Sequence, residues 1–259
     1  MPRRTVLGAM GLAAATLLGC SAGGPRDEEA TLKARPRARV RARPLPRPTG
    51  DTPAADGVAS LDVPGASRAV LLYVPANLRG GQPRLVVSLH GAGGEAQSSV
   101  ARFRPWADAH RLLVLAPASQ GTTWDVLGGS WGPDVEVIDA ALAKVFDAYP
   151  IDPGEVSISG FSDGASYALS LGLANGDLFR HIIAFSPGFV APGPRAGSPD
   201  VYVSHGTQDD VLPIDRTSRV IVPDLREAGY QVQLNEFDGP HAVPERIAED
   251  AADWLASGR

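Results

Sequence analysis

The fold is decided by the stretch Val156-Ser157-Ile158-Ser159-Gly160-Phe161-Ser162-Asp163-Gly164-Ala165, which joins two regular elements through a sharp turn. The β-branched run at its start predicts a strand, and residues 165–174 predict a helix. Glycine on either side of Ser162 leaves room for the strand and the helix to pass closely. Gly-x-Ser-x-Gly between a strand and a helix is typical of a turn that presents a reactive serine. An ordinary strand-to-helix turn is the plain alternative, so the rest of the chain must decide.

Strands and helices are expected to alternate on both sides of this turn. Continuous apolar runs predict buried strands, and a period of 3.6 residues predicts the helices between them. Besides the two elements that flank Ser162, we expect strands at residues 58–63, 68–74, 85–89, 112–115, 181–185, 200–204 and 231–237, and helices at 95–110, 135–148, 216–228 and 244–256. This order predicts one α/β domain over residues 57–259, with a mostly parallel sheet flanked by helices on both faces.

The composition is that of an ordinary globular protein. Of the 259 residues, 44% are hydrophobic and 20% are charged, which allows a sizeable core. The net charge of −5 is too small to favour nucleic acid as a partner. Since Cys20 is the only cysteine, no intramolecular disulfide can form, and the fold must be held by its core.

Residues 1–20 have the pattern of an export signal. Arg3-Arg4 precede an apolar run, residues 6–18, that is too short to span a bilayer. Leu17-Leu18-Gly19-Cys20 resembles the cleavage box of bacterial lipoproteins, in which the cysteine becomes the lipidated first residue. The paired arginines also resemble a twin-arginine signal. We therefore expect an exported protein that a lipid on Cys20 anchors to the outer face of the bacterial cell membrane.

Residues 21–56 are expected to form a disordered tether between this anchor and the domain. Arginine and proline predominate from residue 35 to residue 48, where there is no acidic residue. Proline and charges that repel one another keep such a segment extended. An alternative interpretation is that the arginines bind anionic lipid or wall polymer as a second anchor.

A serine nucleophile at residue 162 requires a base and an acid that orients the base. His241 directly follows the last predicted strand in a Gly-Pro-His loop and is the candidate base. Asp209 and Asp210 both follow the strand predicted at 200–204, and the residue pattern by itself does not choose between them. His205, which precedes a glycine at a strand end, is expected to brace its loop, as is His90.

The serine also requires two donors for the oxyanion that forms on the substrate. The backbone N–H of Asp163, at the start of the helix, is one candidate. The N–H of Ala92, in a glycine-rich loop that can approach the substrate closely, is the other. Trp124 and Trp131 are candidate walls for the substrate, with plain packing as the alternative for each.

Four motifs together resemble the carboxylesterase/phospholipase branch of the α/β-hydrolase superfamily. They are Leu89-His90-Gly91-x-Gly93-Gly94, Gly160-Phe161-Ser162-x-Gly164, His205-Gly206-Thr207-x-Asp209-x-Val211-x-Pro213 and Gly239-Pro240-His241. Tyr73-Val74-Pro75, ahead of the first motif, is similar to polyhydroxybutyrate depolymerases and feruloyl esterases. The resemblance covers residues 68–256 and implies an α/β-hydrolase fold with Ser162 as nucleophile, His241 as base and Asp209 as orienting acid.

The resemblance implies a serine esterase that acts through an acyl-enzyme intermediate and needs neither a metal nor another cofactor. Short-chain or aryl esters are the expected substrates, either small molecules or polymers. Two features depart from the family pattern: Asp163 stands where many relatives carry glutamine or alanine, and the disulfide cysteines of many secreted depolymerases are absent.

Two other functions share parts of this pattern. A serine peptidase of the prolyl-oligopeptidase type has the same triad order, but it usually carries a propeller for which this chain has no room. A non-catalytic surface lipoprotein on a hydrolase scaffold would bind a ligand without turning it over, and the complete set of triad candidates argues against it. The sequence carries no indication of the oligomeric state.

Overall fold

The computed structural model of the chain describes residues 30–36, 57–76, 78 and 82–257. The export signal, Cys20 and most of the predicted tether lie outside these residues. None of the helices in the described part is long and apolar enough to cross a membrane.

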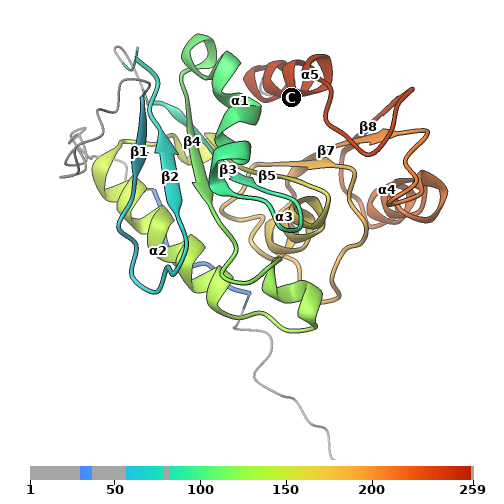
Figure 1. Cartoon of the computed structure of the whole chain (residues 1–259), viewed down its shortest axis with the longest axis horizontal. Helices are drawn as coiled ribbons and strands as arrows, with labels where there is room; N and C mark the ends of the chain where they lie inside the picture. The colour runs from blue at the N-terminus through green and yellow to red at the C-terminus, as the bar shows by residue number, and fades with distance from the viewer. Residues whose placement is uncertain (1–29, 37–56, 77, 79–81, 258–259) are drawn as a thin grey trace, which may run out of the picture.

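Eight strands form one sheet in the order β1-β2-β4-β3-β5-β6-β7-β8 (Figure 1). The strands are β1 (Val58–Ser60), β2 (Val70–Tyr73), β3 (Arg84–Leu89), β4 (Leu112–Pro117), β5 (Val156–Phe161), β6 (His181–Phe185), β7 (Asp200–Gly206) and β8 (Val232–Phe237). The β1–β2 and β2–β4 pairs are antiparallel, whereas the pairs from β4 to β8 are parallel. The mostly parallel sheet predicted from the sequence is confirmed.

Helices cover both faces of the sheet. They are α1 (Ala96–His110), α2 (Pro133–Ala148), α3 (Asp163–Ala174), α4 (Ser218–Glu227) and α5 (Glu245–Ala256). The residues of α1 and α5 belong to one hydrophobic core, and those of α2, α3 and α4 belong to a second, larger core. Every predicted element is present, with ends that differ from the prediction by at most three residues.

The helix that follows Ser162 is the most enclosed helix of the larger core. Ten of the 12 residues of α3 are buried, and the helix packs against β5 and β6. Because α3 has almost no exposed face, its N-terminus is held in one position relative to the end of β5. This enclosure fixes the turn that carries Ser162.

Residues 30–36, which we call the N-terminal strap, pack onto the domain, so the prediction of a disordered tether is wrong for this segment. Leu32 has an exposed fraction of 0% and belongs to the larger core. Its N–H donates to Oδ1 of Asn175 at 2.8 Å, and Nδ2 of Asn175 donates to the carbonyl of Ala30 at 2.7 Å. Asn175 caps the C-terminus of α3, so the strap is tied to the end of the central helix.

The other half of the strap is held by α2. The backbone N–H groups of Lys33 and Ala34 both donate to Oδ1 of Asp139, at 2.6 and 2.8 Å. Buried Ala30 and Leu32 alternate with exposed residues along the strap, which is how an extended segment buries one side. This short alternation, rather than the arginine and proline content downstream, determines where the strap lies.

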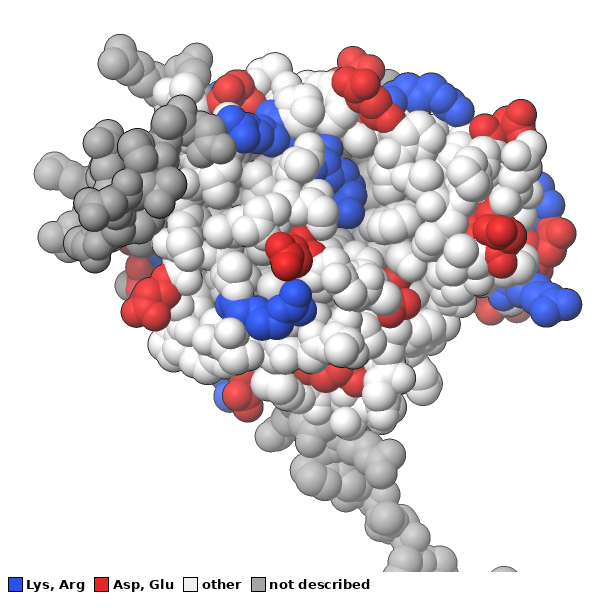
Figure 2. Space-filling model, in the orientation of Figure 1, with Lys and Arg blue, Asp and Glu red and all other residues white. Residues whose placement is uncertain are grey.

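Charged side chains are mixed over the molecular face shown in Figure 2. Lysine and arginine side chains lie among aspartate and glutamate side chains, and neither sign gathers into a broad patch.

Candidate active site

Ser162 occupies a strained turn between β5 and α3. Its backbone has φ 57° and ψ −119°, in the left-handed half of the map that favours glycine, and its N–H donates to the carbonyl of Phe185 at 2.9 Å. A Cβ on Gly160 would overlap the carbonyl of Gly164, and a Cβ on Gly164 would overlap the carbonyl of His90. Both glycines are therefore required by close backbone contact, as the motif predicts.

The structure brings Ser162, His241 and Asp209 together from three loops at one edge of the sheet. Nε2 of His241 lies 2.9 Å from Oγ of Ser162, and Nδ1 lies 2.6 Å from Oδ2 of Asp209. Because an ionised carboxylate only accepts hydrogen bonds, we assign the ring proton to Nδ1, which leaves Nε2 to accept the serine hydroxyl. Asp210 is exposed to solvent, whereas Asp209 is only 5% exposed.

Asp209 is held in the ionised form that orients a histidine. Its Oδ1 accepts the backbone N–H groups of Val211 at 3.0 Å and Leu212 at 2.7 Å. Burial by itself raises the pKa of Asp209, but the hydrogen bonds from Leu212 and His241 outweigh burial, so the pKa lies below its ordinary value. The site therefore keeps a negative charge next to the imidazole at neutral pH.

His205 contacts the same carboxylate oxygen of Asp209 that His241 contacts. The buried ring places Nε2 2.8 Å from the carbonyl of Leu212 and 3.1 Å from Oδ2 of Asp209, while Nδ1 lies 2.7 Å from Oγ of Ser218. Burial lowers the pKa of His205, so the ring stays neutral and donates through Nε2. The expected bracing role is confirmed, and the contact with the orienting acid is one that sequence reasoning missed.

Two backbone N–H groups next to Ser162 remain available to an oxyanion. In the glycine-rich loop, Gly93 N–H donates to the carbonyl of Thr122 at 2.8 Å, and Gly94 N–H donates to the carbonyl of Gly91 at 3.0 Å. The N–H groups of Ala92 and Asp163 have no hydrogen-bond partner among the described residues. A Cβ on Gly91 would lie 3.4 Å from Cβ of Ser162, so this loop lies directly against the serine.

Residues 122 and 123 hold in place the two segments that carry these N–H donors. The carbonyl of Thr122 fixes the glycine-rich loop through Gly93, as above, and Oγ1 of Thr123 donates to Oδ2 of Asp163 at 2.6 Å. The carboxylate at residue 163 is therefore turned toward the loop that follows β4. Nothing in the residue pattern indicated this role for Thr123.

Trp124 is a packing residue, so its prediction as a substrate wall is wrong. It is 1% exposed, and its indole N–H donates to the carbonyl of His90 at 2.9 Å. Its ring centroid lies 5.0 Å from that of His90 and 5.0 Å from that of Tyr167, so neighbouring rings cover it. The interaction braces the strand end that leads into the glycine-rich loop.

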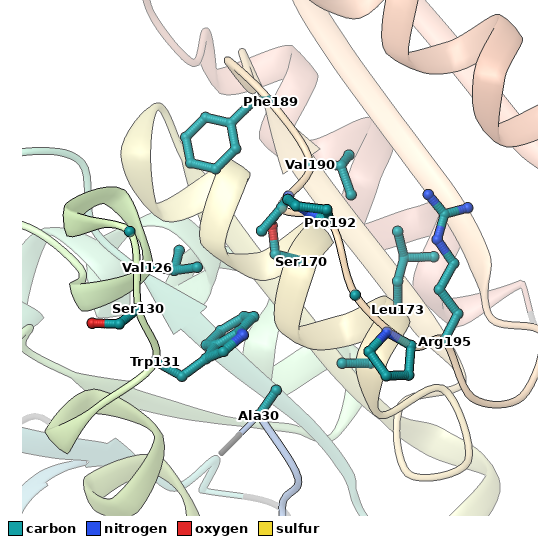
Figure 3. Close-up of a pocket in the computed structure, with 15 residues that line it drawn as sticks. Ala30, Val126, Ser130, Trp131, Ser170, Leu173, Phe189, Val190, Pro192 and Arg195 are labelled. Atoms are coloured by element: carbon teal, nitrogen blue, oxygen red, sulfur yellow. The ribbon is translucent and has the colours of Figure 1, made fainter. Parts of the chain in front are cut away.

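Trp131, in contrast, lines a cavity of about 730 Å³ that runs beside α3 (Figure 3). Phe189 lies at one end of this cavity and Ala30 of the strap lies at the other, with Ser170 and Leu173 of α3 between them (Figure 3). The described residues include no group of three histidine, cysteine, aspartate or glutamate side chains placed to hold a metal ion.

Comparison with known proteins gives a consistent family relationship. Residues 79–257 match the family model described as phospholipase/carboxylesterase. The chain is 32% identical over 158 residues to a probable feruloyl esterase C of Aspergillus flavus, an alignment that covers 57% of each chain. It is 29% identical over 123 residues to an acetylxylan esterase of Coprinopsis cinerea, covering 43% of this chain and 33% of that protein. The chain thus spans about half or less of the length of these curated relatives.

Solved structures share the fold. The crystal structure of esterase PE8 has a TM-score of 0.61 and 26% identity, and the match covers 73% of this chain and 97% of that one. An S-formylglutathione hydrolase of Staphylococcus aureus has a TM-score of 0.63 and 16% identity, with 77% and 95% covered, and it supports the fold alone.

Proposed function

The chain belongs to the phospholipase/carboxylesterase family of α/β-hydrolases, a family of carboxylic ester hydrolases, and on that premise we propose that it is a serine esterase with Ser162, His241 and Asp209 as its catalytic residues. The observation that carries the proposal is the unbroken chain of hydrogen bonds from Asp209 through His241 to Ser162. The two unpartnered N–H groups beside the serine support it further.

In the first half of the reaction, Nε2 of His241 takes the hydroxyl proton as Oγ of Ser162 attacks the ester carbonyl carbon. The carbonyl oxygen becomes an oxyanion that accepts hydrogen bonds from the N–H groups of Ala92 and Asp163. Asp209 stabilises the imidazolium that forms. His241 then gives its proton to the leaving alcohol, and the acyl group remains on Ser162.

In the second half, a water molecule replaces the alcohol. His241 takes a proton from this water as its oxygen attacks the acyl carbon, and the same two N–H groups hold the second oxyanion. Collapse of the intermediate returns the proton to Ser162 and releases the carboxylic acid. Every proton in these steps passes through Nε2 of His241, which lies 2.9 Å from Oγ of Ser162.

We propose short-chain or aryl esters, on a small molecule or a polymer, as the substrate class. The names of the two curated relatives, a feruloyl esterase and an acetylxylan esterase, support an aryl or a short acyl group. The aromatic rings of Trp131 and Phe189 on the cavity wall suit an apolar or planar substituent.

The test is turnover of p-nitrophenyl acetate, butyrate and octanoate by the purified protein. We expect turnover that falls with chain length and is lost in Ser162→Ala. Ser159→Ala is the matched control, because this buried serine of β5, three residues before Ser162, has a hydroxyl without a hydrogen-bond partner among the described residues. Turnover that survives Ser162→Ala, or a folded wild type that hydrolyses none of the three esters, would contradict the proposal.

We further propose that Cys20 carries a lipid that anchors the exported protein. The cleavage-box pattern around the only cysteine of the chain supports this placement. Metabolic labelling with a palmitate analogue tests it: the label is expected on the wild type and absent from Cys20→Ser, with the unlabelled protein released from the membrane fraction. Equal labelling of both proteins would refute the anchor.

A further inference from the structure

The cavity beside α3 has an end wall that comes from outside the family region. Ala30, which is 7% exposed, lines the cavity on the strap side, opposite Phe189 (Figure 3). The family match begins at residue 79, whereas the strap ends at residue 36. The strap is therefore a feature of this chain that the family match does not include.

The face of α3 that lines the cavity leads back to the nucleophile. Asp163, Ser166, Ser170 and Leu173 are spaced by three or four residues and so lie on one face of the helix. At a rise of about 1.5 Å per residue, Ser170 lies about 12 Å from Ser162 along the helix axis, and Ala174, at the strap end, lies about 18 Å away. The cavity is thus a groove along α3, the helix that begins directly after Ser162, on the helix face that also carries Asp163.

Hydrogen bonds join the near end of this groove to the nucleophile. Oγ of Ser166 donates to the carbonyl of Ser162 at 3.3 Å and accepts the N–H of Gly188 at 2.9 Å and that of Phe189 at 3.4 Å. Phe189 is therefore held about one helical turn from Ser162. Its ring, 37% exposed, lines the end of the groove nearest to Ser162.

The groove fits the acyl part of an ester rather than the alcohol. The leaving oxygen must face Nε2 of His241, which returns the proton to it. None of the described residues that line the groove belongs to the loop at 238–244 that carries His241. The group that enters the groove is therefore on the opposite side of the carbonyl carbon, which is the acyl side.

We propose that this groove binds the acyl chain of the ester and that the N-terminal strap is its end wall, so that Ala30 sets the longest acyl chain the enzyme accepts. The inference rests on the proposed esterase activity, because an acyl site is defined by attack of Ser162 on the ester. Its ligand class is a linear or aryl apolar acyl group, since Trp131, Leu173 and Ala30 present carbon surface to the groove.

The test measures kcat/KM over a series of p-nitrophenyl esters that extends to acyl chains long enough to reach the strap end of the groove, about 18 Å from Ser162, using the full chain. Ala30→Leu fills the end of the groove, and we expect the longest acyl chain that is still turned over to become shorter, with at least about a tenfold further loss of kcat/KM for each methylene that no longer fits. Ala30→Gly should move this limit the other way. Lys33→Leu adds the same side chain at an exposed strap position and should leave the limit unchanged.

The outcomes separate the two proposals. If Ala30→Leu instead detaches the strap, the wall opens and the limit moves to longer chains, which also supports the inference. A limit that is the same in wild type and both Ala30 variants overturns the end wall while leaving the esterase intact. Loss of all turnover on every ester in the wild type counts against the esterase itself.

A binding measurement tests the wall without turnover. In the Ser162→Ala background, sodium myristate, whose extended chain is long enough to reach from Ser162 to the strap end of the groove, is titrated while tryptophan fluorescence is recorded. Trp131→Phe identifies the part of the signal that comes from the groove. We expect Ala30→Leu to weaken myristate binding at least about tenfold, and Lys33→Leu to leave it unchanged. Equal binding by all these variants would overturn the inference whatever the catalytic activity.

Discussion

Removing the side chain of Leu32 measures how firmly the strap is docked. Leu32 is fully buried in the larger core, and Leu→Ala at such a position costs about 2–5 kcal/mol. The loss of global stability also has an upper limit. If the substitution costs more free energy than docking of the strap contributes, the strap detaches while the rest of the domain stays folded. The free energy of unfolding of Leu32→Ala therefore falls by the cost of the substitution or by the docking free energy of the strap, whichever is smaller.

Two assays distinguish these limits. Urea unfolding followed by circular dichroism gives the global free energy of unfolding, and native-state hydrogen exchange reports on the amides of Leu32, Lys33 and Ala34, which are all hydrogen-bonded. A local loss of 2 kcal/mol speeds exchange of these amides about 30-fold even where the global stability changes little.

Lys33→Ala is the matched control, because it shortens an exposed strap side chain and keeps the backbone N–H that binds Asp139. Docking of the strap is refuted if these amides exchange in the wild type as fast as in an unfolded chain, or if Leu32→Ala and Lys33→Ala have the same stability and the same exchange rates. Either result would restore the disordered tether for residues 30–36.

Three further predictions concern the site and its support. Asp209→Asn keeps the shape of the side chain but removes the charge that fixes the tautomer of His241. We therefore expect kcat on p-nitrophenyl butyrate to fall about 10⁴-fold, the loss known for the same change in a serine protease triad. An unchanged kcat would exclude the orienting role. Trp124→Phe leaves the buried carbonyl of His90 without its donor, and urea unfolding should show a loss of about 1–3 kcal/mol. Burial, followed by the charge of Asp134, raises the pKa of Asp125 from 3.8 to about 6. The folded state therefore binds the Asp125 proton more tightly than the unfolded state does. The contribution of this proton to stability is full below pH 3.8 and is lost as the pH rises through about 6. In Asp125→Asn, the urea concentration at the unfolding midpoint should depend less on pH over this range.

The sequence predicted the parts of the site that depend on chain order and local turns. Parallel strands end at the same edge of a sheet, so loops after β5, β7 and β8 must meet there. Ser162 directly follows β5, and Asp209 and His241 lie in the loops after β7 and β8. The two glycines around the serine mark the close contact of β5 with α3. These features are local, and they can be read without a structure.

The features that escaped prediction depend on partners far along the chain. Leu32 is held by Asn175, 143 residues away, and Lys33 by Asp139, 106 residues away, while composition near residue 36 indicates only an extended tether. Trp124 has the same appearance in sequence whether it is exposed or buried, and the carbonyl of His90 that makes it a packing residue is 34 positions away. In each of these cases, contacts with residues distant in the sequence determine where the residue lies.

Docking of the strap also changes the geometry expected of the proposed lipid anchor. A tether that ran free from Cys20 to residue 57 could reach about 130 Å, but the ten residue-to-residue steps from Cys20 to Ala30 reach about 36 Å at most. If Cys20 carries the lipid, the strap end of the domain is therefore the part held nearest to the membrane. That end is also the end wall of the acyl groove, so the same seven residues would both fix how the domain is held and limit which acyl chains reach Ser162.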